Sequence, residues 1–268
     1  MSIGALRNSY QAFRSDLGQA NLKGTFGLAR GLKKFFAERV TPEQAKEELQ
    51  RALAGREESF LELARTQIYE QPASSYRRLL ELAGCEFSDL RAHIHRHGLE
   101  TTLERLAAEG VYLTADEFKG NKEVVRGGQS FLVFPQEFAR STSSPGFAAQ
   151  NSGSRSRPVH FVFSLDFLTA SAPMRCVFFS AHDLFSYSHA VYDAVLPADG
   201  GMNNLLINAK LGISTERWFA RKIPVNNRLV GSYHYLLTYL IVLSGKLFAR
   251  GFPKPGFLDL RDISRIVR

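Results

Sequence analysis

The residues best suited to chemistry lie in one short polar stretch, Gln150 to Pro158. Its serines and glycine leave backbone N–H groups and hydroxyls free to donate, and two arginines add positive charge, so the stretch carries the donors that a phosphate group requires. It is not the Gly-x-x-x-x-Gly-Lys-Ser/Thr loop, which needs a lysine and a helix directly after it. We predict a phosphate-binding loop, and a Ser/Gly-rich connector without a ligand stays open as the alternative. The residues assigned to the loop are Asn151, Ser152, Gly153, Ser154, Arg155, Ser156, Arg157 and Pro158.

The segments around this stretch predict an α/β body. Apolar runs rich in Val and Phe predict strands on both sides of it, and longer periodic runs further along predict helices. Strands separated by helices favour a mostly parallel sheet covered on both faces. The expected strands are 130–134, 159–163, 175–179 and 193–196, and the expected helices are 203–211 and 233–249.

The part of the chain before this body is expected to be helical. Apolar residues at helical spacing between Phe26 and Phe36 predict an amphipathic helix with a basic face. Thr41, Pro42 and Gln44 have the spacing of a capping box, which predicts a helix from there to about Tyr69. Shorter helices are expected at 76–83, at 88–98 and from residue 101. We therefore expect a helical N-terminal region over 1–110 and an α/β body over 111–268.

Composition limits the functional class. With 34 Lys and Arg against 26 Asp and Glu, the net charge of +8 suits an anionic ligand. Two cysteines outside any Cys-x-x-Cys spacing argue against a disulfide scaffold or a zinc ribbon and indicate reduced thiols in a cytoplasm. No secretory signal or membrane-spanning segment is expected, because no uncharged apolar run is long enough. His93, His95 and His97 do not share one helix face, so no metal site is assigned.

Three motifs in chain order give the protein a resemblance to a known superfamily. They are Pro72 to Gly84, Gly110 to Lys119, and the stretch Gln150 to Pro158. Together they resemble the opening half of an adenylate-forming enzyme, most of all the phenylacetate-CoA ligases and the acyl-protein synthetases of bacterial bioluminescence. In that superfamily a Ser/Thr/Gly-rich loop followed by proline grips the ATP phosphates while a carboxylate attacks the α-phosphorus. By position, Asn151, Ser152, Gly153, Ser154 and Pro158 match that loop, whereas Arg155, Ser156 and Val159 depart from its usual pattern.

The resemblance implies a ligase that activates a carboxylic acid as its acyl-adenylate, with ATP and Mg²⁺ as cofactors and CoA or a protein thiol as the acceptor. It places Pro197, Gly200 and Gly201 at the border of the acyl pocket, with Lys210 and Arg217 nearby. From the residues alone, the two glycines predict a turn and the two cations predict a solvated surface. The adenine-binding segment, the ribose-binding aspartate and the catalytic lysine of the superfamily would lie beyond Arg268. We therefore expect the N-terminal part of such an enzyme, with a C-terminal half or a partner chain completing the site and no catalytic residue assigned.

Three other interpretations stay open. Serines near His182, His189 and Asp193 could form a nucleophilic triad, although the chain has no Gly-x-Ser-x-Gly elbow. A basic chain rich in Phe and Tyr could bind RNA or single-stranded DNA, but its cations are scattered and it has no RNP-type strand, which makes nucleic acid the less favoured partner. A fragment of an enzyme could also serve as a non-catalytic scaffold or partner subunit.

Overall fold

The computed structural model of the protein describes residues 27–28, 30–138, 145–150, 160–198, 200–221, 228–249 and 251–258. Contacts divide the chain into two compact units, residues 50–141 and residues 1–49 with 142–268. Helices and strands are both present, so the α/β class is confirmed in its broad sense. The division differs from the expected boundary near residue 110, because the first helix packs into the core of the larger unit and residues 111–138 pack in the smaller one.

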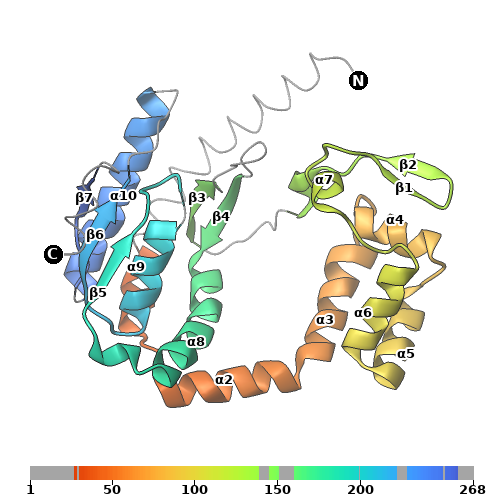
Figure 1. The fold of residues 1–268 in the computed structure, drawn as a ribbon, viewed down its shortest axis with the longest axis horizontal. Helices are drawn as coiled ribbons and strands as arrows, with labels where there is room; N and C mark the ends of the chain where they lie inside the picture. Colours follow the sequence, from red (N-terminus) through yellow and green to blue (C-terminus); the bar gives the residue numbers. More distant parts are fainter. Residues whose placement is uncertain are drawn as a thin grey trace. The chain divides into compact units, whose positions relative to one another are not determined.

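Parallel strands alternating with helices form one end of the larger unit (Figure 1). The elements follow in the order β5 (His189–Tyr192), α9 (Gly200–Lys210), β6 (Thr215–Ala220), α10 (Arg228–Phe248) and β7 (Pro255–Phe257). The strands lie in the spatial order β5-β6-β7, and both neighbouring pairs are parallel. The two helices expected at 203–211 and 233–249 are confirmed as α9 and α10, each beginning a few residues earlier than expected.

The larger unit also contains an antiparallel hairpin followed directly by a long helix. The hairpin pairs β3 (Gly146–Gln150) with β4 (His160–Ser164), and α8 (Leu165–Ala181) begins at the next residue. The strand expected at 159–163 is therefore confirmed as β4. The strand expected at 175–179 was wrong, because this segment lies inside α8, a helix with so little amphipathic contrast that periodicity cannot distinguish it from a buried strand.

Two further strand predictions need correction. Residues 193–196 follow β5 instead of forming a strand, because the ladder with β6 ends at the pair Tyr192 and Phe219. The strand expected at 130–134 is reduced to β2 (Gln129–Phe131), which pairs antiparallel with β1 (Val124–Arg126). The described residues therefore hold one parallel three-stranded sheet and two antiparallel hairpins, in place of a single mostly parallel sheet.

The core of the larger unit is built around the first helix and the β5-β6-β7 sheet. Helical residues 30–37 bury Leu32, Phe35 and Phe36 in this core, with Trp218 of β6 and Phe252 among their partners. The basic side of the same helix, including Lys33 and Lys34, is exposed. The expected amphipathic helix is therefore confirmed, and its apolar side is used for packing.

The predicted start of the next helix is confirmed in detail. In α2 (Pro42–Ala54) the Gln44 N–H donates to Thr41 Oγ1 at 3.3 Å and the Thr41 N–H donates to Gln44 Oε1 at 3.2 Å, which completes the capping box. The chain remains helical to Tyr69, as expected, but Gly55 interrupts it. The continuation is α3 (Arg56–Ala64) and a π-helical turn (Arg65–Tyr69).

The smaller unit is mainly helical, and local caps define its elements. Gly84, with φ +65°, ends α4 (Ser75–Leu82) where the sequence predicted it. The cap of α5 (Phe87–His97) is Glu86, which forms its capping box with Asp89, so the predicted cap at Ser88 was two residues late. The helix predicted from residue 101 is α6 (Leu99–Ala108). The unit ends with α7 (Ala115–Phe118), the β1-β2 hairpin and a 3₁₀ turn (Pro135–Phe138).

Among the helices that the structure describes, none combines the length and apolar character needed to cross a bilayer.

Candidate functional site

The β3-β4 hairpin determines where the predicted phosphate loop must begin and end. Gln150, the last residue of β3, pairs with His160, the first residue of β4. Both ends of the segment 151–159 are therefore held by one antiparallel ladder. The segment itself, with the assigned residues Asn151 to Pro158, lies outside the described residues.

The base of this hairpin is firmly anchored in the larger unit. Phe147 and Phe163 are register partners whose rings stack with centroids 5.7 Å apart, and both are buried. Ser164 then caps α8, since its hydroxyl accepts a hydrogen bond from the Phe167 N–H at 3.1 Å. The Leu165 N–H donates to the Pro145 carbonyl at 2.8 Å, which joins the start of α8 to the strand before the loop. The strands on either side of the segment 151–159 are therefore held in place by packing and hydrogen bonds.

The residues assigned to an acyl-pocket border lie where β5 leads into α9. Pro197 is buried and follows a cis peptide bond, whereas Gly200 and Gly201 are the first two residues of α9. The prediction that the two glycines form only a turn was therefore wrong. A Cβ on Gly201 would lie 2.5 Å from the Ala194 carbonyl oxygen and 2.9 Å from the Trp218 ring, so a glycine is required by packing.

A carboxylate already lies at this helix start. Asp193 follows β5, and a Cβ on Gly200 would lie 2.0 Å from its Oδ2. Its Oδ1 accepts a hydrogen bond from the Ala194 N–H at 2.7 Å, and its carbonyl accepts one from Trp218 Nε1 at 3.0 Å. Helix N-termini ordinarily attract anions. Here the negative charge of Asp193 disfavours a phosphate at the same place, so the hairpin loop remains the phosphate-binding candidate.

Lys210 has a different role from the one predicted. It was expected at a solvated surface, but it is 1% exposed at the end of α9. Its Nζ donates to the Phe35 carbonyl at 3.1 Å, lies 4.8 Å from the centre of the Phe35 ring, and lies 3.9 Å from Glu38 Oε2. Burial lowers the pKa of this ammonium, while Glu38 opposes that change. Arg217, by contrast, is exposed as expected.

The serines and histidines of the alternative nucleophilic site are not brought together. Ser186 donates to the Asp183 carbonyl and Ser188 to Glu216, both at 2.8 Å. His189 Nε2 lies 2.7 Å from the Leu184 carbonyl oxygen, and its ring stacks on Phe179. Neither of these two serines is hydrogen-bonded to His189.

A metal centre is likewise not formed by the described side chains. His93 and His97 stack with ring centroids 6.1 Å apart. The ranges that the structure covers contain no group of three or more His, Cys, Asp or Glu residues placed to hold a metal ion.

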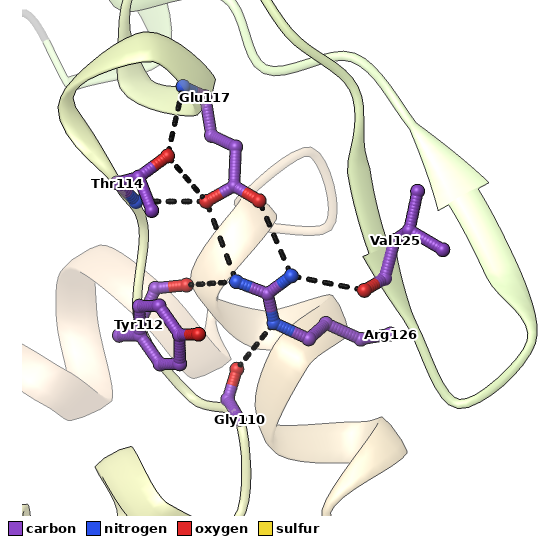
Figure 2. Close-up of polar contacts among 6 residues, drawn as sticks. All are labelled: Gly110, Tyr112, Thr114, Glu117, Val125 and Arg126. Atoms are coloured by element: carbon purple, nitrogen blue, oxygen red, sulfur yellow. Dashed lines mark hydrogen bonds and ion pairs between the residues drawn. The ribbon is translucent and has the colours of Figure 1, made fainter.

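The second motif of the resemblance, Gly110 to Lys119, performs a structural task in the smaller unit (Figure 2). Thr114 and Glu117 form a capping box at α7, and the Arg126 guanidinium lies 3.2 to 3.3 Å from both carboxylate oxygens of Glu117. Arg126 also donates from Nε to the Gly110 carbonyl and covers the Tyr112 ring at 4.5 Å. The motif therefore fixes the chain before the β1-β2 hairpin.

Glu117 is the electrostatic centre of this network. It is 3% exposed, and burial alone would raise its pKa. The hydrogen bonds from Thr114 and Arg126 outweigh burial and lower the pKa below its usual value. The stabilisation that the Glu117 carboxylate gives the folded state is therefore complete above the pKa of a glutamate in the unfolded state, about 4.3. It is lost as the pH falls through the pKa of Glu117 in the folded state.

The variant Glu117→Gln should weaken this network, because an amide cannot pair both of its polar atoms with a guanidinium. We expect the free energy of local unfolding to fall by about 1–3 kcal/mol at pH 7, because Arg126 loses the negative charge that compensates it. Hydrogen exchange over residues 110–131 measures this change. The difference from the wild type should shrink as the pH falls through the pKa of the folded carboxyl. Glu104→Gln, at an exposed position of α6, is the matched control. An equal loss of stability in Glu104→Gln, or a difference between Glu117→Gln and the wild type that does not change with pH, would contradict this role of the Glu117 carboxylate.

The smaller unit also contains a pocket that the sequence did not predict. Its volume is about 120 Å³, and Cys85, Asp89, His93, Arg105 and Glu109 contribute to its lining. Burial raises the pKa of the Cys85 thiol, so this sulfur is not a thiolate ready to attack at neutral pH. Asp89 caps α5 and Arg105 pairs with Glu109 at 2.9 Å, so these groups already have structural partners.

Comparison with known proteins finds no matching family model, no matching curated protein and no matching solved structure. The resemblance to adenylate-forming enzymes therefore depends on the sequence motifs quoted above.

Proposed function

We propose that this protein takes part in the ATP-dependent activation of a carboxylic acid, with Asn151 to Pro158 binding the phosphates of ATP. The observation that carries the proposal is the pairing of Gln150 with His160, which supports a closed loop at this position. A loop held at both ends loses less conformational freedom when it orders around a ligand, which favours binding.

The composition of the loop suits the chemistry. Backbone N–H groups and the hydroxyls of Ser152, Ser154 and Ser156 would donate to phosphate oxygens, and Arg155 and Arg157 would neutralise their charge. One oxygen of the carboxylic acid would attack the α-phosphorus, the bond to the β-phosphate oxygen would break, and pyrophosphate would leave with that bond's electron pair. Mg²⁺ would accompany ATP and screen the phosphate charge.

The proposal includes a thiol acceptor and an intracellular setting. The acyl group would pass from the adenylate to CoA or to a protein thiol. Cys85 and Cys176 are both free and buried, which fits a reducing cytoplasm.

Thermal unfolding of the whole chain with and without Mg·ATP tests the proposal. A ligand that binds only the folded state, at about 100 times its dissociation constant, adds about 2.7 kcal/mol to the free energy of unfolding and raises the midpoint. The double variant Ser152→Ala/Ser154→Ala should lose this rise, because two hydroxyl donors to phosphate are removed.

The double variant Ser186→Ala/Ser188→Ala is a closely matched control. It removes two serines at the same spacing from an exposed connection of the larger unit, so its response to Mg·ATP should equal that of the wild type. An unchanged midpoint for the wild type, or equal responses of the two double variants, would contradict a phosphate-binding role for the loop.

A further inference from the structure

Arg175 is a partly buried cation between two helices of the larger unit. It projects from α8, and its Nη1 donates to Asn204 Oδ1 on α9 at 2.5 Å. The two helices pack directly against each other. In the part of the chain that the structure describes, this hydrogen bond to a neutral amide is the polar contact of Arg175, and no carboxylate lies within ion-pair distance of it.

This situation contrasts with that of Arg126, another partly buried arginine. Arg126, with its side chain 19% exposed, is matched by both oxygens of Glu117 (Figure 2). Charged groups taken out of water are normally paired, because leaving such a charge without a partner is unfavourable. Burial without a compensating acid also lowers the pKa of Arg175. Among the residues that the structure describes, no anion is paired with the partly buried guanidinium of Arg175.

The guanidinium has unused binding capacity. It carries five N–H donors in a planar fork, and Asn204 accepts from only one of its nitrogens. Such a fork matches the paired oxygens of a carboxylate or of a phosphate group. Since Arg175 is only partly buried, solvent and a small ligand can still reach it.

We propose that Arg175 binds an anionic group with paired oxygens, a carboxylate or a phosphate, beside the α8-α9 contact. Asn204 would orient the guanidinium and is a positioning residue. This inference goes beyond the ATP loop and does not depend on it. A substrate carboxylate and a nucleotide phosphate both have the required chemistry, and the experiment separates them.

The experiment is a titration of the whole chain with sodium acetate and, separately, with inorganic phosphate, each at constant ionic strength set by chloride. The guanidinium Nε–H resonance of Arg175 is followed by ¹⁵N NMR and assigned by its absence in Arg175→Met. We expect a saturable shift with one anion or both, and the responding anion identifies the ligand class. Arg175→Lys also lacks this resonance, so it provides the assignment if the methionine variant does not fold.

Isothermal titration calorimetry of the same anions with the wild type and the variants supplies the control. All heats are measured in the Ser152→Ala/Ser154→Ala background, so that the proposed phosphate loop does not contribute to them. In this background saturable binding should disappear in Arg175→Met and weaken about tenfold in Arg175→Lys, because an ammonium lacks the planar fork. Arg217→Met, which removes an exposed arginine of the same unit, should bind as the wild type does. The proposal is overturned if neither anion shifts the resonance saturably, or if Arg175→Met still binds. ATP is not a ligand in this experiment, so a failure of the Arg175 proposal would be distinct from a failure of the ATP proposal.

Discussion

Replacing Lys210 with alanine should lower the free energy of unfolding by about 2–4 kcal/mol. The long side chain is buried in the core, so its loss leaves a cavity, and the Phe35 carbonyl loses the ammonium that donates to it at 3.1 Å. Urea unfolding followed by the fluorescence of Trp218 measures the effect, because this tryptophan is the single one in the chain and lies in the same core.

Lys246→Ala provides the control for Lys210. It removes a lysine from an exposed position of α10, where the change should stay within about 0.5 kcal/mol. If both variants lose the same stability, Lys210 is not the buried connection between α9 and the first helix that its contacts indicate.

The variant Gly201→Ala should destabilise the larger unit by about 2–3 kcal/mol, although alanine is ordinarily the better helix residue. The added methyl group meets the Ala194 carbonyl at 2.5 Å and the Trp218 ring at 2.9 Å, and neither can move aside without shifting the segment after β5 or Trp218 itself. Urea unfolding measures the loss, and the emission maximum of Trp218 should also shift because the methyl group presses on its ring.

Gly200→Ala is the comparison for this second variant. The atoms that its methyl group would meet belong to the carboxylate of Asp193, the end of a side chain that can rotate away. Its loss of stability should therefore be clearly smaller. Equal losses, or a gain for Gly201→Ala, would show that the close packing at the start of α9 does not exist.

Local signals in the sequence were enough to predict a helix end or a strand where neighbouring residues alone determine it. The Thr41–Gln44 capping box, the stop at Gly84 and the strand after the loop depend on neighbouring residues, and all three are confirmed. The strand prediction for 175–179 was wrong, because a buried helix and a buried strand are equally apolar and periodicity could not distinguish them.

The chemistry of single side chains was less predictable, because it depends on distant contacts. Lys210 is buried by Phe35, 175 positions earlier in the chain, and no local pattern indicates such a contact. Arg175 could not be paired with Asn204 while its segment was assigned to a strand. For the proposed phosphate loop, the residue types suggested the chemistry, and the structure adds the pairing of Gln150 with His160 on either side of the segment.

Equilibrium dialysis of radiolabelled ATP with Mg²⁺ against the whole chain is the most direct test of the phosphate loop. We predict one bound ATP per chain, displaced by pyrophosphate but not by adenosine, because the loop would recognise the phosphates. We also predict affinity at least about tenfold weaker in Ser152→Ala/Ser154→Ala, since each lost hydrogen bond to a charged group contributes about 1.5–3 kcal/mol. The absence of binding, binding that pyrophosphate does not displace, or undiminished affinity in the double variant would contradict the proposal.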